Sequence, residues 1–246
     1  VRFKDILENI ESRLHLARCF RQKLVTVPLG IDHPYWVEDA EFDLEFHVRH
    51  IALPRPGDWR QLCIQAARLH SRPLDLAKPL WEMYVIEGLD GVEGLPRGSF
   101  ATLTKIHHAA VDGVTGAEIT AAVHDLTADS KPPTPTVRWE PETNPTGVEL
   151  MFRTAINNVR QPLRFARVLG EFAPPAIRAA LERRSAKPDD EASSVPRTRF
   201  NETVTGHRVF EARTFSLAQI KQIRKRVEGA TVNDVVLAVC GGALRR

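Results

Sequence analysis

Residues 79–113 read "PLWEMYVIEGLDGVEGLPRGSFATLTKIHHAAVDG", and the fold is worked outward from them. Residues 81–89 are an apolar run typical of a strand, and residues 90–99 are rich in glycine, as hairpin loops are. Residues 100–106 predict a return strand. Because two strands joined by such a loop pair side by side, the stretch predicts an antiparallel hairpin that leads into two adjacent histidines.

Outward from this hairpin, the sequence mixes helices and strands without a regular strand–helix–strand repeat. That order favours an α+β fold over a doubly wound sheet. Strands are expected at 23–30, 35–54 and 207–217, and helices at 2–18, 59–71, 116–126 and within 148–184. A further helix is expected at 216–227, with Ser216 as its cap. The last helix is expected from 231 to the end, and its buried face is formed by Val232, Val235, Val236, Val239 and Ala243.

The bulk composition is that of an ordinary soluble domain. The chain has 246 residues, of which 43% are hydrophobic and 26% charged. A net charge of +3 is too small to indicate a nucleic-acid partner. Three widely spaced cysteines without a CxxC pair predict neither a metal site nor a disulfide framework, and they suit a reducing cytosol. No apolar run approaches the ~20 residues of a membrane span, and no signal peptide opens the chain.

His107 and His108 stand where a strand gives way to a helix. In a strand, neighbouring side chains point to opposite faces, so only one of the two is expected to face a given cleft. No third ligand follows at a zinc-like spacing. Two interpretations stay open at this point. Both rings are structural and bonded to nearby backbone, or one is a general base, because histidine with its ordinary pKa of about 6.5 accepts protons near pH 7.

The residues that follow the pair favour the second interpretation. His108, Asp112 and Gly113 form an H-x-x-x-D-G string. Asp112 is expected to brace the loop through an arginine or the backbone, with direct orientation of the imidazole as the alternative. Gly113 supplies either an unusual φ or room for a substrate. No serine or cysteine stands in a nucleophile-elbow pattern, so the acceptor hydroxyl would be deprotonated while it attacks directly.

With these residues in view, the chain resembles the bacterial wax ester synthase/diacylglycerol acyltransferases, within the wider group of CoA-dependent acyltransferases that carry HHxxxDG. The segments that match in order are 42–57, 79–89, 107–113, 197–201 and 231–246. The resemblance implies a chloramphenicol acetyltransferase-like fold of two α+β lobes, with a tunnel between them and the histidine in its middle. A Leu-Ser-x-x-Asp segment that opens most members is absent.

By this resemblance, residues 1–128 are the first lobe and 129–198 are a proline-rich linker with a basic helical crossover. Residues 199–246 then begin a second lobe whose remainder is missing. Both ends look cut, because the terminal helical patterns start and stop without caps. We therefore expect the chain to be part of a larger protein that includes the rest of that lobe.

The resemblance also implies the chemistry. His108 is the general base for transfer of an acyl group from fatty acyl-CoA to diacylglycerol or a long-chain alcohol, and His107 steadies the loop. No cofactor is expected, since acyl-CoA is a substrate. Asn233 is a candidate oxyanion donor; the alternative is that Asn233 and Asp234 cap or brace the helix after Thr231. The segment Pro79, Leu80, Trp81 and Glu82 is interpreted as structural, through core packing and a buried polar contact, and His47 and His50 likewise.

Other readings of the same residues remain. A related HHxxxDG enzyme would use another acceptor, such as an amine on a carrier protein, and a third class would bind lipid without catalysis. Residues 149–184 are basic and amphipathic, with Arg153, Arg160, Arg164 and Arg167. They would place a cytoplasmic enzyme at the inner membrane face or a lipid droplet surface, or else they lie on the lobes with the arginines solvated.

Overall fold

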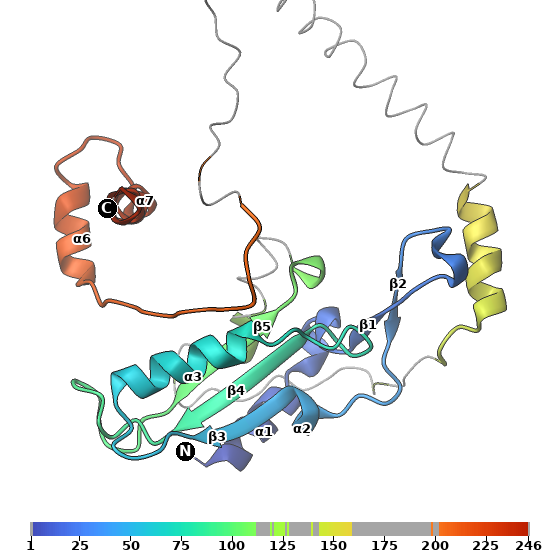
Figure 1. The fold of residues 1–246 in the computed structure, drawn as a ribbon, viewed down its shortest axis with the longest axis horizontal. Helices are drawn as coiled ribbons and strands as arrows, with labels where there is room; N and C mark the ends of the chain where they lie inside the picture. The colour runs from blue at the N-terminus through green and yellow to red at the C-terminus, as the bar shows by residue number, and fades with distance from the viewer. Residues whose placement is uncertain are drawn as a thin grey trace, which may run out of the picture. The chain divides into compact units, whose positions relative to one another are not determined.

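The computed structural model describes residues 2–111, 119, 121–125, 127, 139, 143–158, 198 and 202–245 (Figure 1). The chain divides into two compact units, Val1–Arg208 and Val209–Arg246. Most of the predicted linker and crossover, 129–198, lies outside the described residues. The described elements mix helices with sheet, which confirms the α+β class.

A three-stranded sheet with the order β3-β4-β5 is the centre of the first unit (Figure 1). Its strands are β3 (Val48–Ala52), β4 (Trp81–Glu87) and β5 (Ala101–Ile106). The predicted hairpin is confirmed, since β4 and β5 pair antiparallel. The sequence did not predict that β3 pairs parallel to β4, with helix α3 (Trp59–Ser71) as the crossover between them.

Strand β4 is buried on both faces, which explains its continuous apolar run. Because side chains alternate along a strand, Trp81, Met83 and Val85 enter the core beneath helix α1 (Phe3–Glu11). Tyr84 and Ile86 enter a second core, which α3 covers from the opposite side (Figure 1). The sheet is therefore the middle layer of three.

The start of β4 is fastened by two buried side-chain contacts. The indole Nε1 of Trp81 donates to the carbonyl of Phe20 at 2.9 Å. The Nδ1 of His47 donates to the carbonyl of Trp81 at 2.7 Å, and the two rings stack with their centroids 4.7 Å apart. His47 is 1% exposed, so this histidine belongs to the core.

The predicted strand 35–54 is wrong in its middle. The structure has β2 (Tyr35–Glu38), then the short helix α2 (Leu44–His47), then β3. The side chain of Asp43 accepts a hydrogen bond from the Glu45 backbone and caps α2, so an N-cap interrupts the strand. His50 remains on β3, where its ring pairs with Glu87 at 2.9 Å.

His47 makes the stability of this unit depend on pH. Burial lowers the pKa of His47, against a smaller opposing effect of its hydrogen bond to Trp81. The unfolded chain therefore binds the proton first, and the stabilisation present above the unfolded pKa of about 6.5 is lost as pH falls. We expect the free energy of unfolding in urea to fall from about pH 7 to pH 5, and to fall less in a His47→Phe variant. Equal slopes for the two proteins would contradict this.

The strands β1 (Gln22–Val25) and β2 form a separate antiparallel pair. Residues 147–158 are helical, and this segment buries Leu150 and Thr154. Its Asn157 amide donates to Asp32 at 3.2 Å. The predicted helix 2–18 is shorter than expected, since α1 ends at Glu11 and two 3₁₀ turns, Leu14–Leu16 and Arg18–Phe20, follow. Those turns let Leu14 and Phe20 join the core.

The second unit contains helices α6 (Leu217–Arg224) and α7 (Val232–Leu244). The predicted strand 207–217 is wrong, since residues 207–216 pair with no strand within the described chain, and Val209 is 99% exposed. Ser216 precedes α6 as predicted but makes no side-chain capping bond. On α7 only Val235 of the predicted face is buried, while Val236 and Val239 are exposed.

Candidate active site

The two adjacent histidines lie at the end of β5, where the strand gives way to a short 3₁₀ turn, η4 (His108–Ala110). The backbone N–H of His107 donates to the carbonyl of Leu80 at 2.9 Å. The residues just before β4 therefore hold the turn in place. Both imidazoles are exposed to solvent.

His107 uses its Nδ1 to stabilise the turn. This nitrogen accepts a hydrogen bond from the backbone N–H of Ala109 at 3.0 Å. An Nδ1 that accepts a hydrogen bond leaves the proton of the neutral ring on Nε2. The lone pair of His107 is thus already engaged, and the ring caps the turn.

His108 has the opposite arrangement. Its Nδ1 lies 3.4 Å from the carbonyl oxygen of Val111, a long contact. Because a carbonyl only accepts, this contact favours the tautomer with the proton on Nδ1, in which Nε2 of the neutral ring keeps its lone pair. Of the two histidines, His108 is the one that presents a basic nitrogen.

A pocket of about 580 Å³ adjoins both histidines. Its other lining residues are His70, Arg72, Pro73, Leu74, Leu76, Thr104, Lys105 and Ile106. Both histidines line this one pocket, as do the consecutive β5 residues Thr104, Lys105 and Ile106, whose side chains alternate between the two faces of the sheet. The expectation that His107 and His108 face opposite sides therefore stays a prediction.

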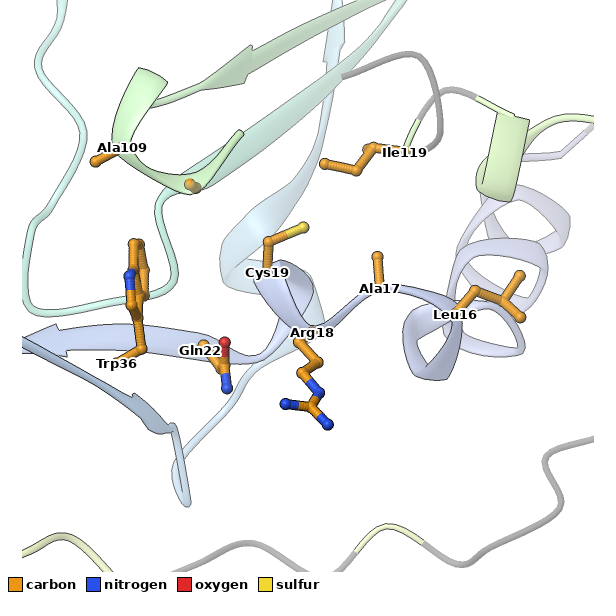
Figure 2. Close-up of a pocket in the computed structure, with 9 residues that line it drawn as sticks. Leu16, Ala17, Arg18, Cys19, Gln22, Trp36, Ala109 and Ile119 are labelled. Carbon is orange, nitrogen blue, oxygen red and sulfur yellow. The ribbon is translucent and has the colours of Figure 1, made fainter. Parts of the chain in front are cut away.

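The η4 turn also borders a second pocket, of about 350 Å³, through Ala109 and Ala110. Figure 2 shows Trp36 of β2, Cys19 and Ile119 reaching into this space from separate segments, while Arg18 points away from it. Burial raises the pKa of the Cys19 thiol, so this cysteine is not activated as a nucleophile.

The segment before the histidine turn is deeply buried. Pro79 and Leu80 are inaccessible, Trp81 is in the core, and Glu82 begins a buried polar network. The carboxylate of Glu82 accepts from the Tyr84 hydroxyl at 2.6 Å and lies 3.9 Å from the Lys105 ammonium. Burial and this hydrogen bond raise the pKa of Tyr84 to about 12.

Lys105 is a site residue that the sequence reasoning missed. It lies directly opposite Glu82 in the β4–β5 register, and its Nζ donates to the Arg72 carbonyl at 2.6 Å. Burial lowers the pKa of Lys105, and Glu82 opposes that shift. A signal for this residue was present in the sequence. Lys105 stands two residues before the histidine pair, in a strand that was expected to pair with the strand of Glu82, so a lysine–glutamate contact across the hairpin could have been expected.

Of the remaining predicted site residues, Asn233 and Asp234 belong to the second unit. Asp112 and Gly113 lie outside the described residues. Asp234 forms a capping box with Thr231: its carboxylate accepts from the Thr231 backbone at 2.7 Å, and this bond lowers the pKa of Asp234. Asn233 is exposed beside it, in the second unit.

Comparison with known proteins assigns the family. Residues 2–236 match the family model of the wax ester synthase/diacylglycerol acyltransferase catalytic domain. The chain belongs to this wax ester synthase/diacylglycerol acyltransferase family. A putative diacylglycerol O-acyltransferase of Mycobacterium tuberculosis is 35% identical over 245 residues, covering 97% of this chain and 50% of that protein. A second one from the same species is 34% identical over 237 residues, covering 96% of this chain and 45% of that protein.

A solved structure agrees with this family assignment. The wax ester synthase/diacylglycerol acyltransferase from Marinobacter aquaeolei VT8 superposes with a TM-score of 0.58 at 27% identity, covering 100% of this chain and 51% of that one. The chain thus spans about half the length of these two Mycobacterium tuberculosis relatives. The predicted family and fold, an acyltransferase lobe of α+β architecture, are confirmed.

Proposed function

We propose that this wax ester synthase/diacylglycerol acyltransferase family member moves a long-chain acyl group from fatty acyl-CoA to the hydroxyl of diacylglycerol or a long-chain alcohol. The observation that carries the proposal is the exposed ring of His108 in the lining of a pocket whose wall includes Leu74, Leu76 and Ile106, with Nδ1 and not Nε2 directed to a backbone carbonyl. Such a wall suits a water-insoluble substrate. Acyl-CoA enters as substrate, and no cofactor takes part.

In the proposed reaction, Nε2 of His108 takes the hydroxyl proton while the acceptor oxygen attacks the thioester carbonyl carbon. The tetrahedral intermediate then expels the thiolate as its C–S bond breaks, and the imidazolium returns the proton to that sulfur. The products are one ester and one CoA thiol. Base catalysis of this kind contributes about 10²–10⁴-fold in rate.

The neighbouring residues have supporting parts in this proposal. His107 caps the turn that carries His108, and Leu80 anchors its backbone. Because Asp234 is used in the capping box, Asn233 is the member of that pair whose amide is proposed to donate to the oxyanion. Asp112 and Gly113 are proposed to shape the loop after the turn.

The test is acceptor-dependent release of CoA. Purified full-length protein with palmitoyl-CoA should release thiol and form ester in equal amounts when diacylglycerol or hexadecanol is added, and the ratio of the two rates ranks the acceptors. Thiol release that needs an amine acceptor instead would favour the related HHxxxDG chemistry. Binding of acyl-CoA without turnover with any acceptor would favour a lipid-binding protein.

The helical segment 147–158 supports a peripheral location at a lipid surface. Its apolar side chains Val148, Met151, Phe152 and Ile156 are 40% to 78% exposed, opposite the buried Leu150 and Thr154. Of the four arginines expected there, Arg153 is described and exposed, and the other three lie outside the described residues. None of the described helices is long and apolar enough to cross a bilayer.

We expect a Phe152→Ser/Ile156→Ser variant to bind anionic phospholipid vesicles at least about tenfold more weakly in co-sedimentation, because two apolar side chains no longer leave water. The matched control is Val209→Ser/Phe210→Ser, which changes two exposed apolar side chains outside the helix. Unchanged binding of the double variant would contradict a membrane role for this face.

A further inference from the structure

The pocket beside His108 is lined by basic as well as apolar side chains. Arg72 and Lys105 both line it, and no aspartate or glutamate is among its described lining residues. The second pocket at the same turn has one arginine, Arg18, whose side chain points away from the space (Figure 2). Of the two pockets that border η4, the first is therefore the one suited to an anionic ligand.

Arg72 has the position of a rim residue for such a ligand. It follows the last residue of α3 with extended backbone and is exposed. Within the part of the chain that the structure describes, no carboxylate forms an ion pair with its guanidinium. A free guanidinium offers a planar fork of N–H donors that matches phosphate oxygens.

Lys105 fixes the position of the Arg72 backbone through a hydrogen bond. Its ammonium is buried, donates to the Arg72 carbonyl at 2.6 Å and lies 3.9 Å from Glu82. The contact joins the strand that carries the histidines to the end of α3, where free carbonyl groups favour a cation. Because Lys105 is committed to these two partners, we assign it a positioning role and not phosphate binding.

Resting on the proposed acyl transfer, we propose that this pocket receives the phosphate-bearing arm of acyl-CoA, with Arg72 binding a phosphate and Lys105 positioning Arg72. The apolar residues Pro73, Leu74 and Leu76 follow Arg72 directly and line the same pocket. Acyl-CoA matches this combination, because its phosphates would meet Arg72 and the less polar pantetheine, which leads to the thioester, would meet the apolar residues.

The test compares acyl carriers that differ in phosphate. In the full-length enzyme, Arg72→Ala should lower kcat/KM for palmitoyl-CoA about tenfold, since one charge-assisted phosphate contact is lost. The same variant should match wild type with palmitoyl-pantetheine, which has no phosphate. Palmitoyl-phosphopantetheine, which keeps only the phosphate attached to pantetheine, shows which phosphate Arg72 binds. If Arg72→Ala lowers kcat/KM for this substrate, Arg72 binds the pantetheine phosphate; if kcat/KM is unchanged, Arg72 binds a phosphate of the nucleotide.

The matched control is Arg68→Ala, which removes an exposed arginine one turn earlier on α3 that does not line the pocket. It should leave all three kcat/KM values unchanged. Equal losses for Arg72→Ala with palmitoyl-CoA and palmitoyl-pantetheine, or no loss with either, would overturn the phosphate assignment. Because wild-type turnover is measured in the same assay, failure of this proposal is separate from failure of the proposed reaction.

The positioning role of Lys105 is tested by a double-mutant cycle. At a temperature where circular dichroism shows each variant folded, Lys105→Met should raise KM for palmitoyl-CoA about tenfold with little change in kcat. In the Arg72→Ala background, Lys105→Met should have no further effect, and Lys105→Arg should restore part of the loss in the otherwise wild-type protein. Full additivity of the two substitutions, or wild-type kinetics of folded Lys105→Met, would overturn it.

Discussion

A His108→Ala variant is expected to form ester about 10²–10⁴-fold more slowly than wild type at saturating palmitoyl-CoA and acceptor. The substitution removes the proposed base from the lining of the pocket, and the only hydrogen bond it breaks among the described residues is the long contact of Nδ1 with Val111. Because the ring is exposed, its removal should leave the free energy of unfolding within about 0.5 kcal/mol of wild type. Radiolabelled ester formation and urea unfolding measure the two quantities on the same preparations.

The neighbouring histidine is the matched control for this prediction. His107→Ala deletes the same side chain one position earlier, but it removes a capping bond to Ala109 and not a free base. We expect it to cost about 1 kcal/mol of stability and to slow the reaction far less than His108→Ala does. If the two variants lost activity equally, or His107→Ala lost more, the assignment of the base to His108 would be wrong.

A Trp81→Ala variant is expected to destabilise the first unit by about 3–5 kcal/mol. The indole is 3% exposed, stacks on His47 and meets Phe20 edge-on with the ring centroids 5.3 Å apart. Truncation leaves a cavity between α1 and the sheet and removes the donor to the Phe20 carbonyl. Urea unfolding followed by circular dichroism measures the change.

A Trp81→Phe variant separates the contribution of packing from that of the hydrogen bond to Phe20. Phenylalanine keeps a ring in the cavity and loses the Nε1 bond to Phe20, so we expect a smaller loss of about 1–3 kcal/mol. Trp81→Ala should also lower the rate of ester formation, because the carbonyl of the adjacent Leu80 accepts the backbone hydrogen bond of His107. A loss below about 1 kcal/mol for Trp81→Ala would show that β4 does not depend on this side chain.

The sequence predicted the β4–β5 hairpin and helix α3 because the signals of these elements are local. A continuous apolar run, a glycine-rich loop and a return strand are enough to define β4 and β5, and apolar residues at helical spacing are enough to indicate α3. The parallel pairing of β3 with β4 was beyond such reasoning, because strands separated by a helix give no local signal of which neighbour they join. The strand expected at 207–217 failed for a related reason, since an extended segment becomes a strand only with a partner.

The candidate site was predicted in part. The position of His108 at a strand end followed from the pattern of residues, but the 3₁₀ turn after Ile106 did not, because a turn of three residues leaves no periodic signal. The contact of Lys105 with the Arg72 carbonyl was not predictable, since it depends on the β4–β5 register and on where α3 ends. The structural role predicted for His47 agrees with its burial, and its stacking on Trp81 is what the sequence did not predict.

Rescue of a His108→Gly variant by added imidazole tests the account most directly, because the free base replaces the missing ring. The measured quantity is the rate of ester formation from palmitoyl-CoA and diacylglycerol as the imidazole concentration rises. We predict a rate that increases with imidazole in His108→Gly and stays flat in wild type and in His107→Gly. A His108→Gly variant that binds palmitoyl-CoA normally, yet is as active as wild type or equally inactive at every imidazole concentration, would contradict a base at this position.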